Sequence, residues 1–148
     1  MADQSNQLPN QLRVRLVTPE RTLVEATASA VELPAKTGYI EVLYGHAPLL
    51  AELGAGDVRL HGAAGEGQEP EQTYNVSWGF VEVLPERVTL LANDALKPEE
   101  IDVKRAQKQF DHGLELWNQA GESEEKYDHA LHVIAEAEAK LATAQEKR

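Results

Sequence analysis

Hydrophobic and polar residues alternate in short runs along residues 8–94. The run at 12–17 reads Leu-Arg-Val-Arg-Leu-Val, which in an extended chain places apolar and charged side chains on opposite faces. Five further runs repeat the pattern, at residues 31–33, 40–42, 58–60, 81–83 and 88–90. Prolines and glycines fall between these runs, so the spacing predicts a β-sandwich or barrel. The aperiodic stretch 62–70 is predicted to be a flexible hairpin tip.

From residue 98 the apolar positions recur every three or four residues, as on one face of a helix. Pro98 followed by Glu99 and Glu100 is typical of a helix N-terminus, and Gly121 of a helix end. Ser123 is expected to cap a second helix. The two apolar stripes comprise Val103, Ala106, Phe110, Leu114 and Trp117, then Tyr127, Ala130, Ile134, Ala137, Leu141 and Ala144.

These patterns predict two domains, a β-sandwich over residues 8–95 and an antiparallel two-helix hairpin over 96–148. A region of roughly 90 residues can sustain its own core, so we expect the β domain to fold without the hairpin. Two helices alone bury little. The hairpin is therefore expected to lean on the β domain or on another protein.

Charge and composition narrow the functional classes. The 148 residues include 14 basic and 25 acidic side chains, a net charge of −11, which argues against binding to nucleic acid or to an anionic bilayer. No apolar run is long enough for direct insertion into a bilayer, and the polar N-terminus lacks signal-peptide features, so a cytoplasmic location is expected. The absence of cysteine excludes disulfides and thiolate chemistry.

Candidate catalytic chemistry is sparse. A metal site across the hairpin is conceivable because His129 and His132 lie one helical turn apart and His112 lies on the other predicted helix. Solvated helix faces explain these histidines better. Phosphate-loop, nucleophile-elbow and dinucleotide motifs are missing. The sequence therefore favours a binding or structural protein with no catalytic residue, no metal and no cofactor.

One segment combines a rigid turn with an apolar run: Gly45-His46-Ala47-Pro48-Leu49-Leu50-Ala51-Glu52-Leu53. It is either a core strand after a loop or a preformed apolar edge for docking. Both interpretations stay open at this point.

Five motifs in a fixed order, followed by the helical pair, carry a family resemblance. They are Leu33-Pro34 through Gly45-His46-Ala47-Pro48-Leu49-Leu50, then Gly56-Asp57-Val58-Arg59, Val76 to Val83, Val88 to Ala92, and Ile101-Asp102-Val103-Lys104-Arg105-Ala106. Over roughly residues 10–147 the chain resembles the epsilon subunit of the rotary proton-translocating (F-type) ATP synthase. The resemblance implies a β-sandwich of about ten strands followed by two antiparallel helices. It also implies a non-catalytic rotor component in the central stalk, coupling proton translocation to ATP synthesis.

The same resemblance implies partners and a location. The gamma subunit would contact His46, Pro48, Leu49 and Leu50, with Trp78 nearby. The c-subunit ring would contact Tyr39, Ile40 and Glu41, and the alpha and beta subunits would meet the extended hairpin. The complex would hold the chain peripherally at the cytoplasmic face of the bacterial inner membrane.

Three positions depart from the family pattern. Glu41 stands at a usual glycine and Tyr44 at a usual proline, and Trp78 stands where a small residue is common. Loss of glycine at 41 implies either a backbone without positive φ or tolerated strain. The Trp78 ring is expected either to fill the core or to widen the apolar face toward gamma.

The segment containing Asp102 and Arg105 matches the family's ATP-binding motif. Leu96 and His112 replace an acidic and a basic residue of the binding members, and the second helix has no arginine before Arg148. A phosphate chain needs several converging cations, so we predict weak ATP binding at best. A helix-start cap is the preferred interpretation of this pair.

Residues 99–148 carry seven basic and 12 acidic side chains, a net charge of −5. In the family, inhibition of ATP hydrolysis is associated with basic hairpin residues facing acidic segments of beta, so we predict weak inhibition here. Two other functions are weighed against the rotor subunit. One is a free-standing adaptor that binds a partner through the hairpin, and the other is a small metal-dependent enzyme.

Overall fold

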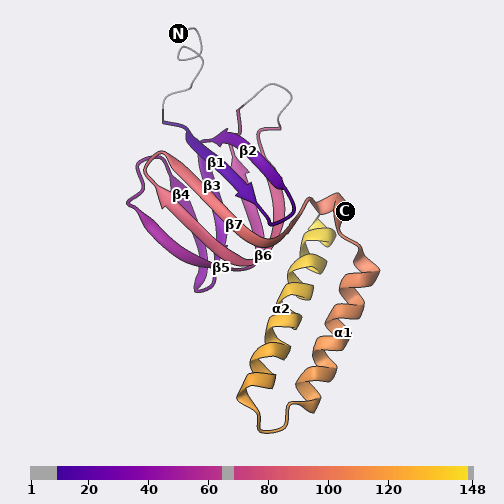
Figure 1. Cartoon of the computed structure of the whole chain (residues 1–148). Coiled ribbons are helices and arrows are strands. Elements are labelled where there is room, and N and C mark those ends of the chain that lie inside the picture. Colours follow the sequence, from indigo (N-terminus) through magenta and orange to yellow (C-terminus); the bar gives the residue numbers. More distant parts are fainter. Residues whose placement is uncertain (1–9, 65–68, 147–148) are drawn as a thin grey trace. The chain divides into compact units, whose positions relative to one another are not determined.

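The computed structural model describes residues 10–64 and 69–146. The chain divides into two compact units, 1–95 and 96–148. Strands make up the first unit and two helices dominate the second (Figure 1). The predicted fold class, a β-sandwich followed by a helical hairpin, is confirmed. The part of hairpin tip 62–70 at residues 65–68 lies outside the described residues.

Seven strands form the sheet within the described residues, in the order β2-β1-β7-β6-β5-β3-β4. The pair β1–β7 is parallel, whereas β1–β2, β3–β4, β3–β5 and β5–β6 are antiparallel. The strand bounds are β1 Leu12–Val17, β2 Thr22–Ala28, β3 Ala30–Ala35, β4 Gly38–Leu43, β5 Leu49–His61, β6 Gln72–Leu84 and β7 Arg87–Leu96.

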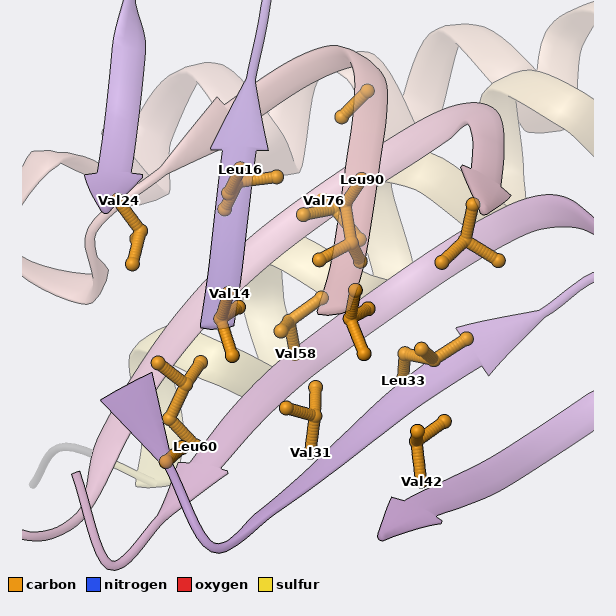
Figure 2. Packing of buried hydrophobic residues seen from close by; sticks show 14 of the residues in the cluster. Val14, Leu16, Val24, Val31, Leu33, Val42, Val58, Leu60, Val76 and Leu90 are labelled. Carbon is orange, nitrogen blue, oxygen red and sulfur yellow. The ribbon is translucent and has the colours of Figure 1, made fainter. Parts of the chain in front are cut away.

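The inner face of this sheet is closed to solvent. Leu12, Leu33, Val58 and Leu90, from four strands, are all fully buried. A flat sheet leaves both of its faces in water, so such burial requires the sheet to fold over itself into two layers. Figure 2 shows the side chains of β1, β3, β5 and β7 converging on one core.

The number of strands differs from the expected ten because β5 and β6 are long. Each has 13 residues, and the two stay paired from Leu49 opposite Val83 to Leu60 opposite Gln72. One continuous ribbon therefore serves both layers where the sequence suggested shorter strands. All six alternating runs lie within strands.

The second unit begins with a short 3₁₀ turn η2, Pro98–Glu100, and continues with α1, Val103–Gln119, and α2, Glu124–Glu146. The expectation that the first helix begins at Pro98 is wrong. Asp102 is the N-cap of α1, and its Oδ1 accepts a hydrogen bond from the Arg105 N–H at 3.1 Å. Pro98 instead opens the 3₁₀ turn.

The other predicted ends of the helices are confirmed. Gly121 has a φ of 60° directly after the C-cap Ala120. The Ser123 hydroxyl accepts a hydrogen bond from the Lys126 N–H at 3.3 Å at the start of α2. These two residues account for the short connection between the helices.

Small residues line the contact between the helices. Ala106, Gly113, Ala130 and Ala137 are buried. A Cβ added at Gly113 would lie 2.6 Å from Cγ1 of Ile134, so the close approach requires glycine there. The ring of Trp117 meets that of Tyr127 edge to face, with centroids 4.7 Å apart.

Candidate functional site

The turn between β4 and β5 is fastened to the turn between β6 and β7. The Gly45 N–H donates to the Pro85 carbonyl at 2.7 Å, and the His46 N–H donates to the Leu43 carbonyl at 3.1 Å. Gly45 has a φ of 87°, which favours glycine. These bonds give the segment 45–48 a defined place at one end of the sheet.

Large apolar side chains lie exposed on the strands that leave this end. Leu50 in β5, Phe80 in β6 and Leu91 in β7 are 72%, 52% and 54% exposed, and we call these three residues the apolar strip. Leu50 pairs with Glu82 and Glu52 pairs with Phe80, so Leu50 and Phe80 are diagonal neighbours on one face. Leu49 is also exposed, and strand alternation places it on the opposite face of β5 from Leu50.

Each of the two interpretations of segment 45–53, a core strand or an exposed apolar edge, therefore applies to part of it. Leu53 is buried and belongs to the core, whereas Pro48, Leu49 and Leu50 face solvent. Phe80 and Leu91 extend the exposed surface beyond the residues predicted from sequence. The signal was available in the alternation Phe80-Val81-Glu82-Val83, which assigns Phe80 to the polar face.

Trp78 has a backbone conformation that side chains rarely adopt. Its φ is 60°, and the residue is half-buried. A glycine takes this conformation without strain, whereas a tryptophan side chain is strained there. Among described residues other than glycine, Asn10 alone shares a positive φ, so Glu41 and Tyr44 carry no such strain.

The residues expected at the c ring lie on the edge strand β4. Tyr39 is exposed, and its hydroxyl accepts a hydrogen bond from the Asp57 N–H at 2.9 Å. A Cβ at Gly56 would lie 2.4 Å from that hydroxyl, so glycine there makes room for the Tyr39 side chain. Glu41 is exposed, whereas Ile40 packs against the core.

Asp102 and Arg105, the two residues of the ATP-binding motif, lie at the start of α1. The Asp102 carboxylate is engaged as the helix cap described above, which is the interpretation preferred from sequence. The Arg105 side chain is exposed and has no ion pair with any residue that the structure describes.

One histidine lies between two carboxylates, an arrangement that was not predicted from the sequence. His61, the last residue of β5, has its Nε2 3.2 Å from Oε1 of Glu32, and its Nδ1 contacts Oε2 of Glu71. Burial lowers the pKa of His61, but the hydrogen bonds and charges of Glu71 and Glu32 outweigh it and leave the pKa raised. Sheet register creates this cluster, because Ala30 pairs with His61 and brings Glu32 alongside.

Over residues 10–64 and 69–146, no group of three or more His, Asp or Glu side chains is placed to hold a metal ion. None of the helices in the described part of the chain has the length and hydropathy needed to cross a bilayer.

Comparison with known proteins identifies the family of this chain. Residues 11–109 match the family model "ATP synthase, Delta/Epsilon chain, beta-sandwich domain". An ATP synthase epsilon chain of Solibacter usitatus is 38% identical over 141 residues, covering 95% of this chain and all of that one. A chain of the same name from Koribacter versatilis is 44% identical over 93 residues, 63% of this chain and 62% of that one.

A chloroplastic ATP synthase epsilon chain of Porphyra purpurea is 33% identical over 133 residues, covering 90% of this chain and 95% of that one. Among solved structures, a chain in the cryo-EM structure of the Euglena gracilis mitochondrial ATP synthase, OSCP/F1/c-ring, superimposes with a TM-score of 0.71. The pair is 20% identical over 93% of this chain and 83% of the other, so this likeness concerns the fold.

Proposed function

Because the chain belongs to the ATP synthase epsilon-chain family, we propose that it works as a non-catalytic rotor component in the central stalk of an F-type ATP synthase. In this role it binds the gamma subunit and the ring of c subunits, and so couples proton translocation to ATP synthesis. The assembled complex holds it peripherally at the cytoplasmic face of a bacterial inner membrane.

The exposed apolar strip carries the proposal for gamma. Leu50, Phe80 and Leu91 lie on a sheet whose inner leucines are fully buried, and large apolar side chains in water beside a fixed turn suit a preformed interface. Leu49, Pro48 and His46 are proposed to add gamma contacts at the adjoining turn. Half-buried Trp78, two residues before Phe80 in β6, is proposed to border the strip.

For the c ring we propose contacts through Tyr39 and Glu41. Both are exposed on edge strand β4, and the Asp57 N–H positions the Tyr39 hydroxyl. Ile40 supports the strand from the core side.

The gamma surface is tested by co-purification with a tagged gamma subunit. Leu50→Asp places a charge in the centre of the proposed interface, while its 72% exposure predicts an intact fold. We expect this variant to lose gamma. Leu131→Asp makes the same substitution at an exposed leucine of the hairpin, and this variant should still bind gamma. Full gamma binding by Leu50→Asp would refute the proposed interface.

For the hairpin we propose a regulatory role with weak inhibition of ATP hydrolysis through contacts with alpha and beta subunits. The supporting observation is its net charge of −5 over residues 99–148, which disfavours an acidic partner. Deleting these residues from the assembled complex should raise hydrolysis by less than tenfold, about 1.4 kcal/mol. A larger rise would contradict weak inhibition.

Weak ATP binding at the hairpin is part of the same proposal. The Asp102 carboxylate caps α1, and Arg105 is the one arginine in helix positions of the hairpin. A single guanidinium supplies too few donors for a phosphate chain. Calorimetry should give no submillimolar affinity for ATP.

A further inference from the structure

Three arginines line one groove of the sheet unit. Arg13 and Arg15 lie in β1 and Arg87 lies in β7, and all three line an open groove of about 690 Å³. Residues 1–95 contain only six basic side chains against 13 acidic ones, a net charge of −7. Half of the cations of a strongly acidic unit are therefore gathered at this groove.

Sheet register sets two of these arginines side by side. Arg13 and Arg87 are direct partners in the parallel β1–β7 pair. Both alternate with buried neighbours, so they occupy the same outer face. Like charges directly opposite on a sheet are destabilising, and long-range pairing of residues 74 positions apart brings them together here. An anion between the two guanidiniums removes that repulsion.

The carboxylates at the groove pair with two of the three arginines. Arg15 Nε lies 3.3 Å from Oε1 of Glu25, and Arg87 Nη2 lies 3.9 Å from Oε1 of Glu82. The Arg13 side chain has no ion pair with any residue in the described part of the chain. The five charged side chains of the groove carry three positive and two negative charges, a net charge of +1.

We propose that this groove binds a small anion with two or more phosphate groups, with Arg13 and Arg87 as its principal ligands. Guanidinium groups donate paired hydrogen bonds that match phosphate oxygens, and several converging cations are what a phosphate chain requires. Thr89, the register partner of Arg15, adds a hydroxyl to the groove lining. The volume lies in the range of small-molecule sites, roughly 300–1,000 Å³.

Two other occupants fit less well. Glu25 and Glu82 flank the arginines and repel an extended acidic peptide that crosses the groove. An anionic lipid surface meets a unit with a net charge of −7, which opposes adsorption. A compact free anion does not have to cross the groove past both carboxylates, and it shares Arg87 with Glu82.

The test is an NMR titration of the ¹⁵N-labelled full chain with sodium pyrophosphate at constant ionic strength. We expect amide shifts localised around Arg13, Arg87 and Thr89. Arg13→Gln and Arg87→Gln should each weaken binding about tenfold, as for the loss of a charge-assisted hydrogen bond. Because both side chains lie on the exposed face, their spectra should otherwise show an intact fold.

The control is Lys108→Gln, which removes one positive charge from an exposed position of α1 outside the Asp102–Arg105 motif. This variant should bind pyrophosphate as well as the parent chain. The proposal fails if shifts are absent, if sodium chloride reproduces them, or if Arg105→Gln and not Arg13→Gln abolishes them. Tighter Arg13-dependent binding of a glutamate decapeptide or of phosphatidylglycerol vesicles would also overturn it.

Discussion

Leucine and valine side chains fill the interior of the sheet unit, whereas alanine, glycine and threonine fill that of the hairpin. Leu12, Leu33 and Leu60 are fully buried in the sheet. In the hairpin, Leu114 and Trp117 remain 42% and 41% exposed although both belong to the predicted apolar stripe. Fully burying a leucine contributes about 1.5–3 kcal/mol, against about 0.8 kcal/mol for a single methyl group.

This difference in packing indicates which substitutions the chain tolerates without unfolding. The sheet has a core that excludes water by itself, so substitutions inside it act on the whole unit. The hairpin is held by close backbone approach and a narrow seam, and part of its apolar stripe stays available for other contacts. Such an element suits the regulatory role proposed above.

The largest difference in the loss of stability is expected between two leucine-to-alanine variants, one in each unit. Leu60→Ala empties a fully buried site and should lower the free energy of unfolding of the sheet by about 2–5 kcal/mol. Leu131→Ala, at an exposed position of α2, should change the stability of the hairpin by less than about 0.5 kcal/mol. Urea unfolding can separate the units, because Trp78 reports on the sheet and Trp117 on the hairpin.

Equal losses in these two variants would show that both units are stabilised by the same kind of core. In that case the distinction between leucine and small-residue packing would have no energetic meaning.

A bulky residue at the helix seam should break the hairpin more than the sheet. Gly113→Val forces atoms into the space of Ile134 and should cost the hairpin about 1–3 kcal/mol. His112→Val introduces the same side chain at the preceding exposed position and serves as its control. Far-UV circular dichroism should show loss of helix at lower urea for Gly113→Val, and an unchanged midpoint would contradict the close packing.

Backbone strain at Trp78 can be isolated by comparing two variants. Trp78→Gly should be more stable than Trp78→Ala by about 1 kcal/mol, because a φ of 60° strains alanine and not glycine. At Phe80, an exposed strand residue without positive φ, the order should reverse, with alanine favoured by about 0.5–1 kcal/mol. Chemical denaturation followed by circular dichroism measures both pairs, and the same order at both sites would exclude strain.

The smallest effect is expected from protonation of His61. Its pKa is raised in the folded sheet, so its stabilising contribution is complete below the unfolded value of about 6.5 and is lost as the pH rises through the folded pKa. Thermal unfolding of the sheet between pH 6 and 8.5 should show this loss. It should vanish in His61→Gln and persist in His46→Gln; a pH dependence unchanged in His61→Gln would assign it elsewhere.

Alternation and spacing in the sequence determined most of the secondary structure. Six strand segments and both helices follow from periods of two and of about 3.6, since these periods reflect which side chains face a core. Strand β2 was not predicted because Leu23 and Val24 are adjacent, which breaks the alternation of apolar and polar residues. The caps at Gly121 and Ser123 were readable because they depend on neighbours in sequence.

Long-range pairing was decided by the tertiary structure alone. The Arg13–Arg87 pair joins β1 to β7, and the contact of Glu32 with His61 joins β3 to β5, and no local pattern encodes these registers. The positive φ of Trp78 and the union of β5 and β6 into one long ribbon likewise depend on how the sheet folds over its core. Sequence periodicity specifies which face of an element is apolar, whereas register between distant strands is set by the packing of the whole sheet.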